Sequence, residues 1–190
     1  MSDTRSAYTE VWAQIYLRRE DEDRLTEFFC NRIGIHRRFV VRGMHITVYH
    51  ARRRMPGLRE VSEETAIRLP AHETRFMVMA PGGENPRNHL DPANRKIGVR
   101  MVRNGIAMPP ILQLRARLLK FETRDVLGSR LPSDSRRNAF GAHHFQPHLS
   151  VLMPGSGVDR DLTKIGVPFR NEIGDLTFNR FRIEIVGASS

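Results

Sequence analysis

Alternating apolar and polar residues predict that much of the chain forms β-strands. A two-residue period places successive side chains on opposite faces, as in a half-buried strand. In the last such segment the alternation changes phase near Asn179, which is typical of a β-bulge. The predicted strands are Tyr8–Leu17, Phe39–Tyr49 with an interruption at Gly43, Arg75–Ala80, Arg95–Arg103, Phe145–Leu152 and Asp175–Val186.

Two segments have the three-to-four spacing of an amphipathic helix instead. Carboxylates at Glu20 to Asp23 precede Leu25, Phe28, Phe29 and Ile33, and Gly34 follows the last of them. The second helix begins at Pro109 and Pro110, where the fixed proline φ suits a first turn. Its apolar positions are Ile111, Leu112, Leu114, Leu118 and Leu119. The segments 84–94 and 128–142 are predicted to be loops.

One unit occurs twice in this pattern. Strand, helix and strand occupy the first quarter of the chain, and strand, helix, loop and strand occupy residues 95–153. This recurrence indicates two related lobes within a single domain, residues 1–190, which is an ordinary domain length.

Composition favours a basic intracellular protein. The formal net charge is +10, and almost all of it is arginine, a side chain that binds phosphate bidentately and stacks on bases. RNA and nucleotides are therefore the expected ligands, although genome composition would also explain the arginine bias. Cys30 is the single cysteine, and no secretory signal or membrane-spanning run is evident. We expect a cytoplasmic protein with no membrane association and no obligate protein partner.

Two short motifs carry the candidate chemistry. They are Met44-His45-Ile46-Thr47-Val48 and Pro147-His148-Leu149-Ser150-Val151. In a strand, each histidine shares a face with the hydroxyl two residues later, while the aliphatic residues enter the opposite layer. An imidazole supplies proton transfer, and a hydroxyl holds a phosphate oxygen. A third histidine-hydroxyl pair, His72-Glu73-Thr74, lacks the aliphatic neighbours and is interpreted as accidental.

These motifs, 103 residues apart, resemble the paired histidine tetrads of the two-histidine phosphoesterases. The resemblance covers the tetrads in detail and the remainder of the chain in layout. It implies an α+β, bilobal fold: two antiparallel-sheet lobes with outer helices and pseudo-twofold symmetry around a central groove. It also implies catalysis without a metal or cofactor, with His45, Thr47, His148 and Ser150 as the catalytic residues.

The family acts on RNA or nucleotide phosphodiesters, so a 2′,3′-cyclic phosphate or a 2′-5′ linkage is the expected substrate. Many bacterial relatives carry a basic residue directly after the second tetrad, where this chain has Leu152. The arginine cluster that begins at Arg52 could replace this cation, or it could be a solvated charge run. Further candidates for substrate binding are Tyr49, Arg136 and Phe140, through stacking or charge.

Histidine chemistry predicts the mechanism. A reference pKa near 6.5 allows one imidazole to act as base and the other as acid at neutral pH. The sequence leaves their assignment open. A zinc site at His143, His144 and His148 is disfavoured because Pro147 opposes a helix there. The alternatives are a non-catalytic, basic RNA- or nucleotide-binding protein and an adaptor that kept the fold without activity.

Overall fold

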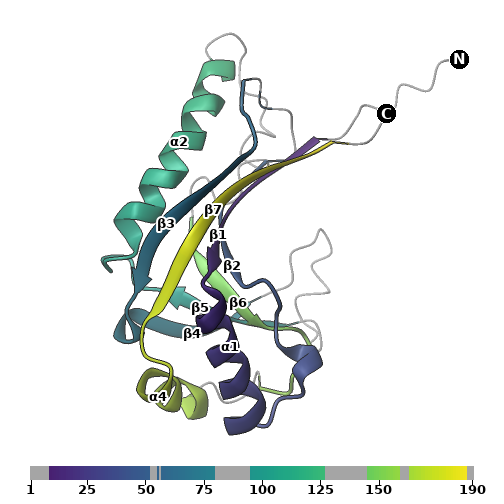
Figure 1. Ribbon diagram of the computed structural model, residues 1–190, viewed down its shortest axis with the longest axis vertical. Helices are drawn as coiled ribbons and strands as arrows, with labels where there is room; N and C mark the ends of the chain where they lie inside the picture. The colour runs from purple at the N-terminus through teal and green to yellow at the C-terminus, as the bar shows by residue number, and fades with distance from the viewer. Residues whose placement is uncertain are drawn as a thin grey trace, which may run out of the picture.

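The computed structural model describes residues 9–51, 55, 57–79, 95–126, 145–158 and 163–187, and the side chains at 9, 122–126, 163 and 164 are outside that description. Within these ranges the chain has seven strands and three α-helices (Figure 1). The strands are β1 (Thr9–Leu17), β2 (His45–Ala51), β3 (Val61–Leu69), β4 (Thr74–Met79), β5 (Lys96–Met101), β6 (His148–Leu152) and β7 (Leu176–Gly187). The helices are α1 (Arg19–Glu27), α2 (Met108–Val126) and α4 (Thr163–Glu172).

All seven strands form one open antiparallel sheet. Their order is β3-β7-β1-β2-β6-β5-β4, so β2 and β6 are adjacent near its middle. The α+β class predicted from the sequence is therefore correct. The described strands form one continuous sheet, whereas the resemblance implied two separate sheet lobes.

The three helices pack against one face of the sheet. Phe76 of β4 is the partner of Val99, and its ring contacts Phe29 after α1 and Phe169 of α4. From α2, Arg117 lies over the ring of Phe181 in β7. Figure 1 shows α2 running along the curved strands β3 and β7, with α1 and α4 near the opposite end of the sheet. No described helix covers the other face.

Helix α1 is attached to the sheet by a buried carboxylate. Asp21 is fully buried and accepts hydrogen bonds from the side chains of Arg18 and Arg24 and from the backbone N–H of Thr177. A buried charge is tolerated when it is paired and hydrogen-bonded in this way. The helix then continues as a π-helical turn over Phe28–Arg32, which contributes Phe29 to the core.

Most predicted elements occur near their expected positions. The phase change at Asn179 is a real register shift, because Tyr16 pairs with Arg180 whereas Leu17 pairs with Phe178. The strand predicted from Phe39 begins instead at His45, after a 3₁₀ turn at Arg37–Phe39. Strand β3 and helix α4 were not predicted. The predicted loops 84–94 and 128–142 lie outside the described residues.

None of the described helices combines the length and the apolar character that a bilayer crossing requires.

Candidate active site

The two histidine motifs lie on neighbouring strands in the middle of the sheet (Figure 1). Ile46 of β2 and Leu149 of β6 are direct partners across the antiparallel pair. The residues that flank Ile46 therefore face the residues that flank Leu149. The facing pairs are His45 with Ser150 and Thr47 with His148. Such partners have Cβ atoms about 4.5–5.5 Å apart, and diagonal neighbours, here the two imidazoles, about 7–8 Å apart.

Burial separates the two sides of both motifs. His45, Thr47, His148 and Ser150 are all partly exposed. The aliphatic residues between and after them are fully buried: Ile46, Val48, Leu149 and Val151. The four polar side chains therefore project together from the sheet face opposite the helices, where a bound group can reach all of them.

Both histidines are oriented by the same local hydrogen bond. Nδ1 of His45 lies 2.8 Å from the carbonyl oxygen of Gly43, and Nδ1 of His148 lies 3.0 Å from that of Gln146. A carbonyl oxygen only accepts hydrogen bonds, so each Nδ1 carries a proton and donates it. In both rings Nε2 is the nitrogen left for proton transfer to or from a ligand.

The two imidazoles interact electrostatically. Burial lowers the pKa of His148 below its usual 6.5, the carbonyl of Gln146 opposes this shift, and the nearby His45 and Lys96 lower the pKa further. A neutral His148 is thus favoured at pH 7. The effect of His45 on this pKa follows from the proximity of the two imidazoles that the strand register produces.

The turn that precedes His45 is held by a carboxylate from α1. Glu22 accepts hydrogen bonds from the backbone N–H groups of Gly43, at 2.9 Å, and of Met44, at 3.1 Å. Gly43 has a φ of 62°, in the left-handed region that favours glycine. The carbonyl of the same Gly43 orients the imidazole of His45. Glu22 therefore holds His45 in position indirectly, through the backbone of Gly43.

Tyr49 belongs to the core, contrary to its predicted place at the substrate. Gln14 pairs with Thr47 whereas Ala13 pairs with Tyr49, so Val48 is the additional residue of a β-bulge. The bulge reverses the alternation and turns Tyr49 to the helix-covered face, where it is fully buried. The next residue, His50, consequently lies on the same face of the sheet as His45 and Thr47.

A buried arginine supports both motifs from the core side. Arg115 of α2 donates to the carbonyl of Val48, at 2.8 Å, and its guanidinium lies over the rings of Tyr49 and Phe145. Tyr49 directly follows the first motif in the sequence, and Phe145 lies two residues before the second motif. On the helix-covered face, the Arg115 side chain therefore contacts residues at or near both motifs.

Arg52, Arg136 and Phe140, the other substrate-binding candidates, lie outside the described residues, as do His143 and His144. Among the residues with described positions, no group of three or more histidine, cysteine, aspartate or glutamate side chains has the arrangement of a metal site.

Several residues beside the motifs were not identified from the sequence. Tyr16 is the cross-strand partner of His45, and the two ring centroids are 5.5 Å apart. Arg100 is the partner of His148 on the next strand. On the sheet face that carries His45 and His148, the ring of Trp12 stacks on that of His50, with the ring centroids 3.6 Å apart. Alternation assigns each of these residues to a face, but only the strand register identifies its neighbours.

Comparisons with protein-family models and with curated proteins give no match for this chain. The geometry of the site is therefore the basis for assigning a function. Two oriented imidazoles with free Nε2 atoms and two hydroxyls around one space are suited to move protons at both ends of a reacting phosphodiester.

Proposed function

We propose that this protein is a metal-independent phosphodiesterase that cleaves a phosphodiester of RNA or a nucleotide by general acid–base catalysis at His45 and His148. The observation that carries the proposal is the pairing of Ile46 with Leu149. This register brings together two proton-transfer groups and two hydroxyls that are 103 residues apart in the chain. A protein that only binds nucleic acid has no need for two matched imidazoles.

The unequal surroundings of the imidazoles support a proposal for their roles. His148 acts as the base, because its lowered pKa and its protonated Nδ1 leave Nε2 with a free lone pair at neutral pH. His45 then acts as the acid through a proton on Nε2. Thr47 and Ser150 donate hydrogen bonds to the non-bridging oxygens, which gain negative charge in the transition state.

For a 2′,3′-cyclic phosphate, the nucleophile is water. Nε2 of His148 takes a proton from water, and the water oxygen forms a bond to phosphorus. The bond from phosphorus to one ribose oxygen breaks, and Nε2 of His45 protonates that oxygen. For a 2′-5′ linkage the neighbouring 3′-hydroxyl replaces water as the nucleophile, and the product is a cyclic phosphate.

We also propose that the sheet consists of two related halves, as in the two-histidine phosphoesterases that the motifs resemble. One half is β1-α1-β2 and the other is β5-α2-β6, with an approximate twofold axis between Ile46 and Leu149. Equivalent bulges support this relation: Val48 is unpaired against β1 and Val151 is unpaired against β5, each three residues after its histidine. The equivalent hydrogen bonds of the two imidazoles support it as well.

Incubation with EDTA and a panel of phosphodiesters tests the function. The panel contains 2′,3′-cyclic nucleotides, RNA ends with a cyclic phosphate, 2′-5′ oligonucleotides, cyclic dinucleotides and an ADP-ribose cyclic phosphate. We expect turnover of at least one of them in EDTA, with a product ending in a cyclic, 2′- or 3′-phosphate. Salt-dependent binding of RNA without turnover of any panel member would instead support the non-catalytic binding protein.

A further inference from the structure

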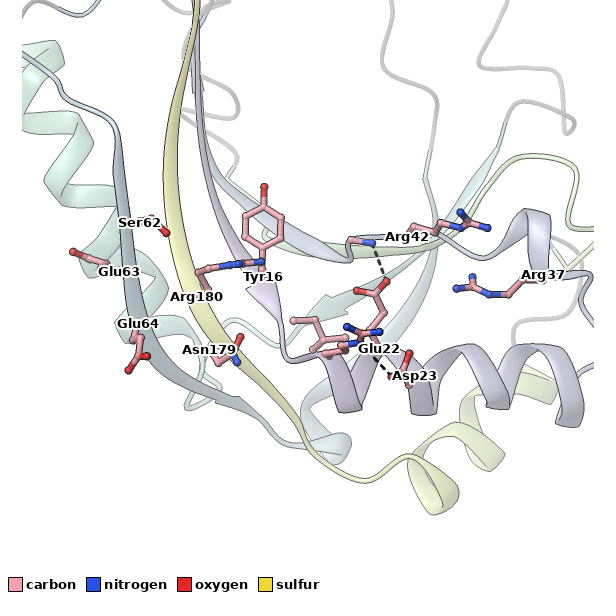
Figure 2. A pocket seen from close by; sticks show the side chains of 13 residues that line it. Tyr16, Glu22, Asp23, Arg37, Arg42, Ser62, Glu63, Glu64, Asn179 and Arg180 are labelled. Atoms are coloured by element: carbon pink, nitrogen blue, oxygen red, sulfur yellow. Dashed lines mark hydrogen bonds and ion pairs between the residues drawn. The ribbon is translucent and has the colours of Figure 1, made fainter.

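A polar pocket of about 940 Å³ is lined by Tyr16 and Gly43, which both contact His45. Figure 2 shows this pocket from close by. Tyr16 lines this pocket and is also the cross-strand partner of His45, so the pocket and the candidate active site share one wall. Other polar contributions come from α1, from the segment before β2, and from β3 and β7. The charged side chains that line it are Arg19, Glu22, Asp23, Arg37, Arg42, Glu63, Glu64 and Arg180.

Most of the carboxylates in this pocket are already engaged. Glu22 accepts hydrogen bonds from two backbone N–H groups, and Glu63 pairs with Arg117 of α2. Asp23 lies 4.0 Å from Arg19. Glu63 and Asp23 therefore have arginine partners that balance their charge, whereas Glu22 is held by neutral N–H groups and keeps its negative charge.

Three of the four arginines have no carboxylate partner among the described residues. Arg37, Arg42 and Arg180 form no ion pair there, and Glu22 and Glu64 are the pocket carboxylates without an arginine partner in the same part of the chain. Figure 2 shows Arg180 beside Tyr16 on one side of the pocket and Arg37 and Arg42 on the other. Arg180 lies 5.3 Å from the centre of the Tyr16 ring. Among the described residues, three arginines without ion pairs therefore outnumber two carboxylates without arginine partners, and all five line a pocket that shares Tyr16 with the candidate active site.

Guanidinium groups that line one pocket without ion-pair partners are suited to bind phosphate, because their planar forks match its oxygens. We propose that this pocket binds a second phosphate of the substrate, carried on the 5′ oxygen of the nucleotide whose phosphodiester is cleaved between His45 and His148. This inference rests on the proposed function and specifies its substrate. An internucleotide phosphate of RNA and a terminal 5′-phosphate both supply the required group.

Three substrates that differ only at the 5′ oxygen test the proposal. They are adenosine 2′,3′-cyclic phosphate, its 5′-phosphorylated form, and the adenosine dinucleotide that ends in a 2′,3′-cyclic phosphate. We expect kcat/KM to be at least about tenfold higher for one or both substrates with a second phosphate, mainly through a lower KM. The substrate with the larger gain identifies whether a terminal or an internucleotide phosphate is preferred.

The arginines are tested by the double variant Arg37→Ala Arg42→Ala. We expect this variant to lose most of the preference for the second phosphate while kcat/KM for adenosine 2′,3′-cyclic phosphate changes less than twofold. Arg38→Ala is the matched control, because Arg38 lies between them in sequence but its guanidinium lies over Phe39, 4.7 Å from the ring centre. Arg38→Ala should keep the preference.

Two outcomes separate the failure of this inference from the failure of the proposed function. Equal kcat/KM for all three substrates, or a preference that survives Arg37→Ala Arg42→Ala, would overturn the phosphate pocket and leave the phosphodiesterase intact. Absence of turnover for these substrates and for the whole phosphodiester panel would overturn the function and the inference with it.

Discussion

His45 and His148 occupy equivalent positions on β2 and β6, yet different side chains surround them. Each donates from Nδ1 to the carbonyl two residues before it. The cross-strand partner is Tyr16 for His45 and Arg100 for His148. What the two sites share is the orientation of the imidazole, and this is the part that acid–base chemistry requires. What differs is the basis on which we propose the roles of the histidines and the side on which the substrate extends.

The hydroxyls show the same contrast. Thr47 is paired with Gln14, a polar residue, whereas Ser150 is paired with Gly98. A Cβ atom at Gly98 would lie 2.3 Å from Sδ of Met79, so the glycine leaves room for that methionine side chain. Sδ of Met79 lies 4.0 Å from Oγ of Ser150. Ser150 therefore has the thioether of Met79 as a neighbour, and burial is the main cause of the lowered pKa of His148 in the same motif.

The largest expected effect tests what the two sites share. His45→Ala and His148→Ala should each lower kcat/KM for the cleaved phosphodiester by about 10²–10⁴-fold, the usual contribution of a positioned acid or base. Both side chains are partly exposed, so the thermal unfolding midpoint should change little. His72→Ala, at an exposed position outside the motifs, is the control. Full activity in the double variant His45→Ala His148→Ala would refute the mechanism.

Loss of either hydroxyl should have the next largest effect. Thr47→Val and Ser150→Ala each remove one donor to the charge that develops on phosphate oxygens, and we expect kcat to fall by about 10²-fold. Thr47→Ser keeps the hydroxyl and should retain activity within about threefold. If Thr47→Val and Thr47→Ser were equally impaired, the methyl group rather than the hydroxyl would be the functional part of this residue.

A smaller effect should appear on the His45 side alone. Glu22→Ala removes the acceptor that holds the turn at Gly43, so His45 loses its fixed orientation, and we expect kcat to fall about tenfold with KM nearly unchanged. The free energy of unfolding should fall by about 1–2 kcal/mol. Glu20→Ala on the same helix is the control, because Glu20 pairs with Arg18 instead. Loss of stability with unchanged kcat would show that Glu22 does not position His45.

The smallest expected effect is a shift in pH dependence on the His148 side. The pKa of His148 is lowered, so the neutral base persists below pH 6.5 and the acid limb of kcat/KM should lie below that value. Lys96→Met removes one cause of this shift, so the pKa should rise and activity should be lost at a higher pH on acidification. Lys120→Met, at an exposed position on α2, should leave the limb in place. A limb unaffected by Lys96→Met would argue against His148 as the base.

The local sequence pattern was sufficient to predict the elements whose inward-facing positions are apolar. It failed to predict elements that contain polar or helix-disfavouring residues and that tertiary contacts stabilise. Strand β3 has Glu63 at an inward position, and the charge is accommodated because Arg117 of α2 pairs with it. Helix α4 contains Gly166 and Pro168, which disfavour a helix. It forms where Ile165 and Phe169 are buried against the sheet, and packing of this kind outweighs propensity.

The sequence by itself determined the composition of each motif and the face that its residues share, because the alternation of a strand is a local property. It also indicated the bulge at Asn179. Only the tertiary structure decided that β2 pairs with β6 through Ile46 and Leu149, since strand register depends on contacts between distant segments. It likewise decided that the bulge at Val48 turns Tyr49 into the core, and that Tyr16 and its arginine neighbours lie beside His45.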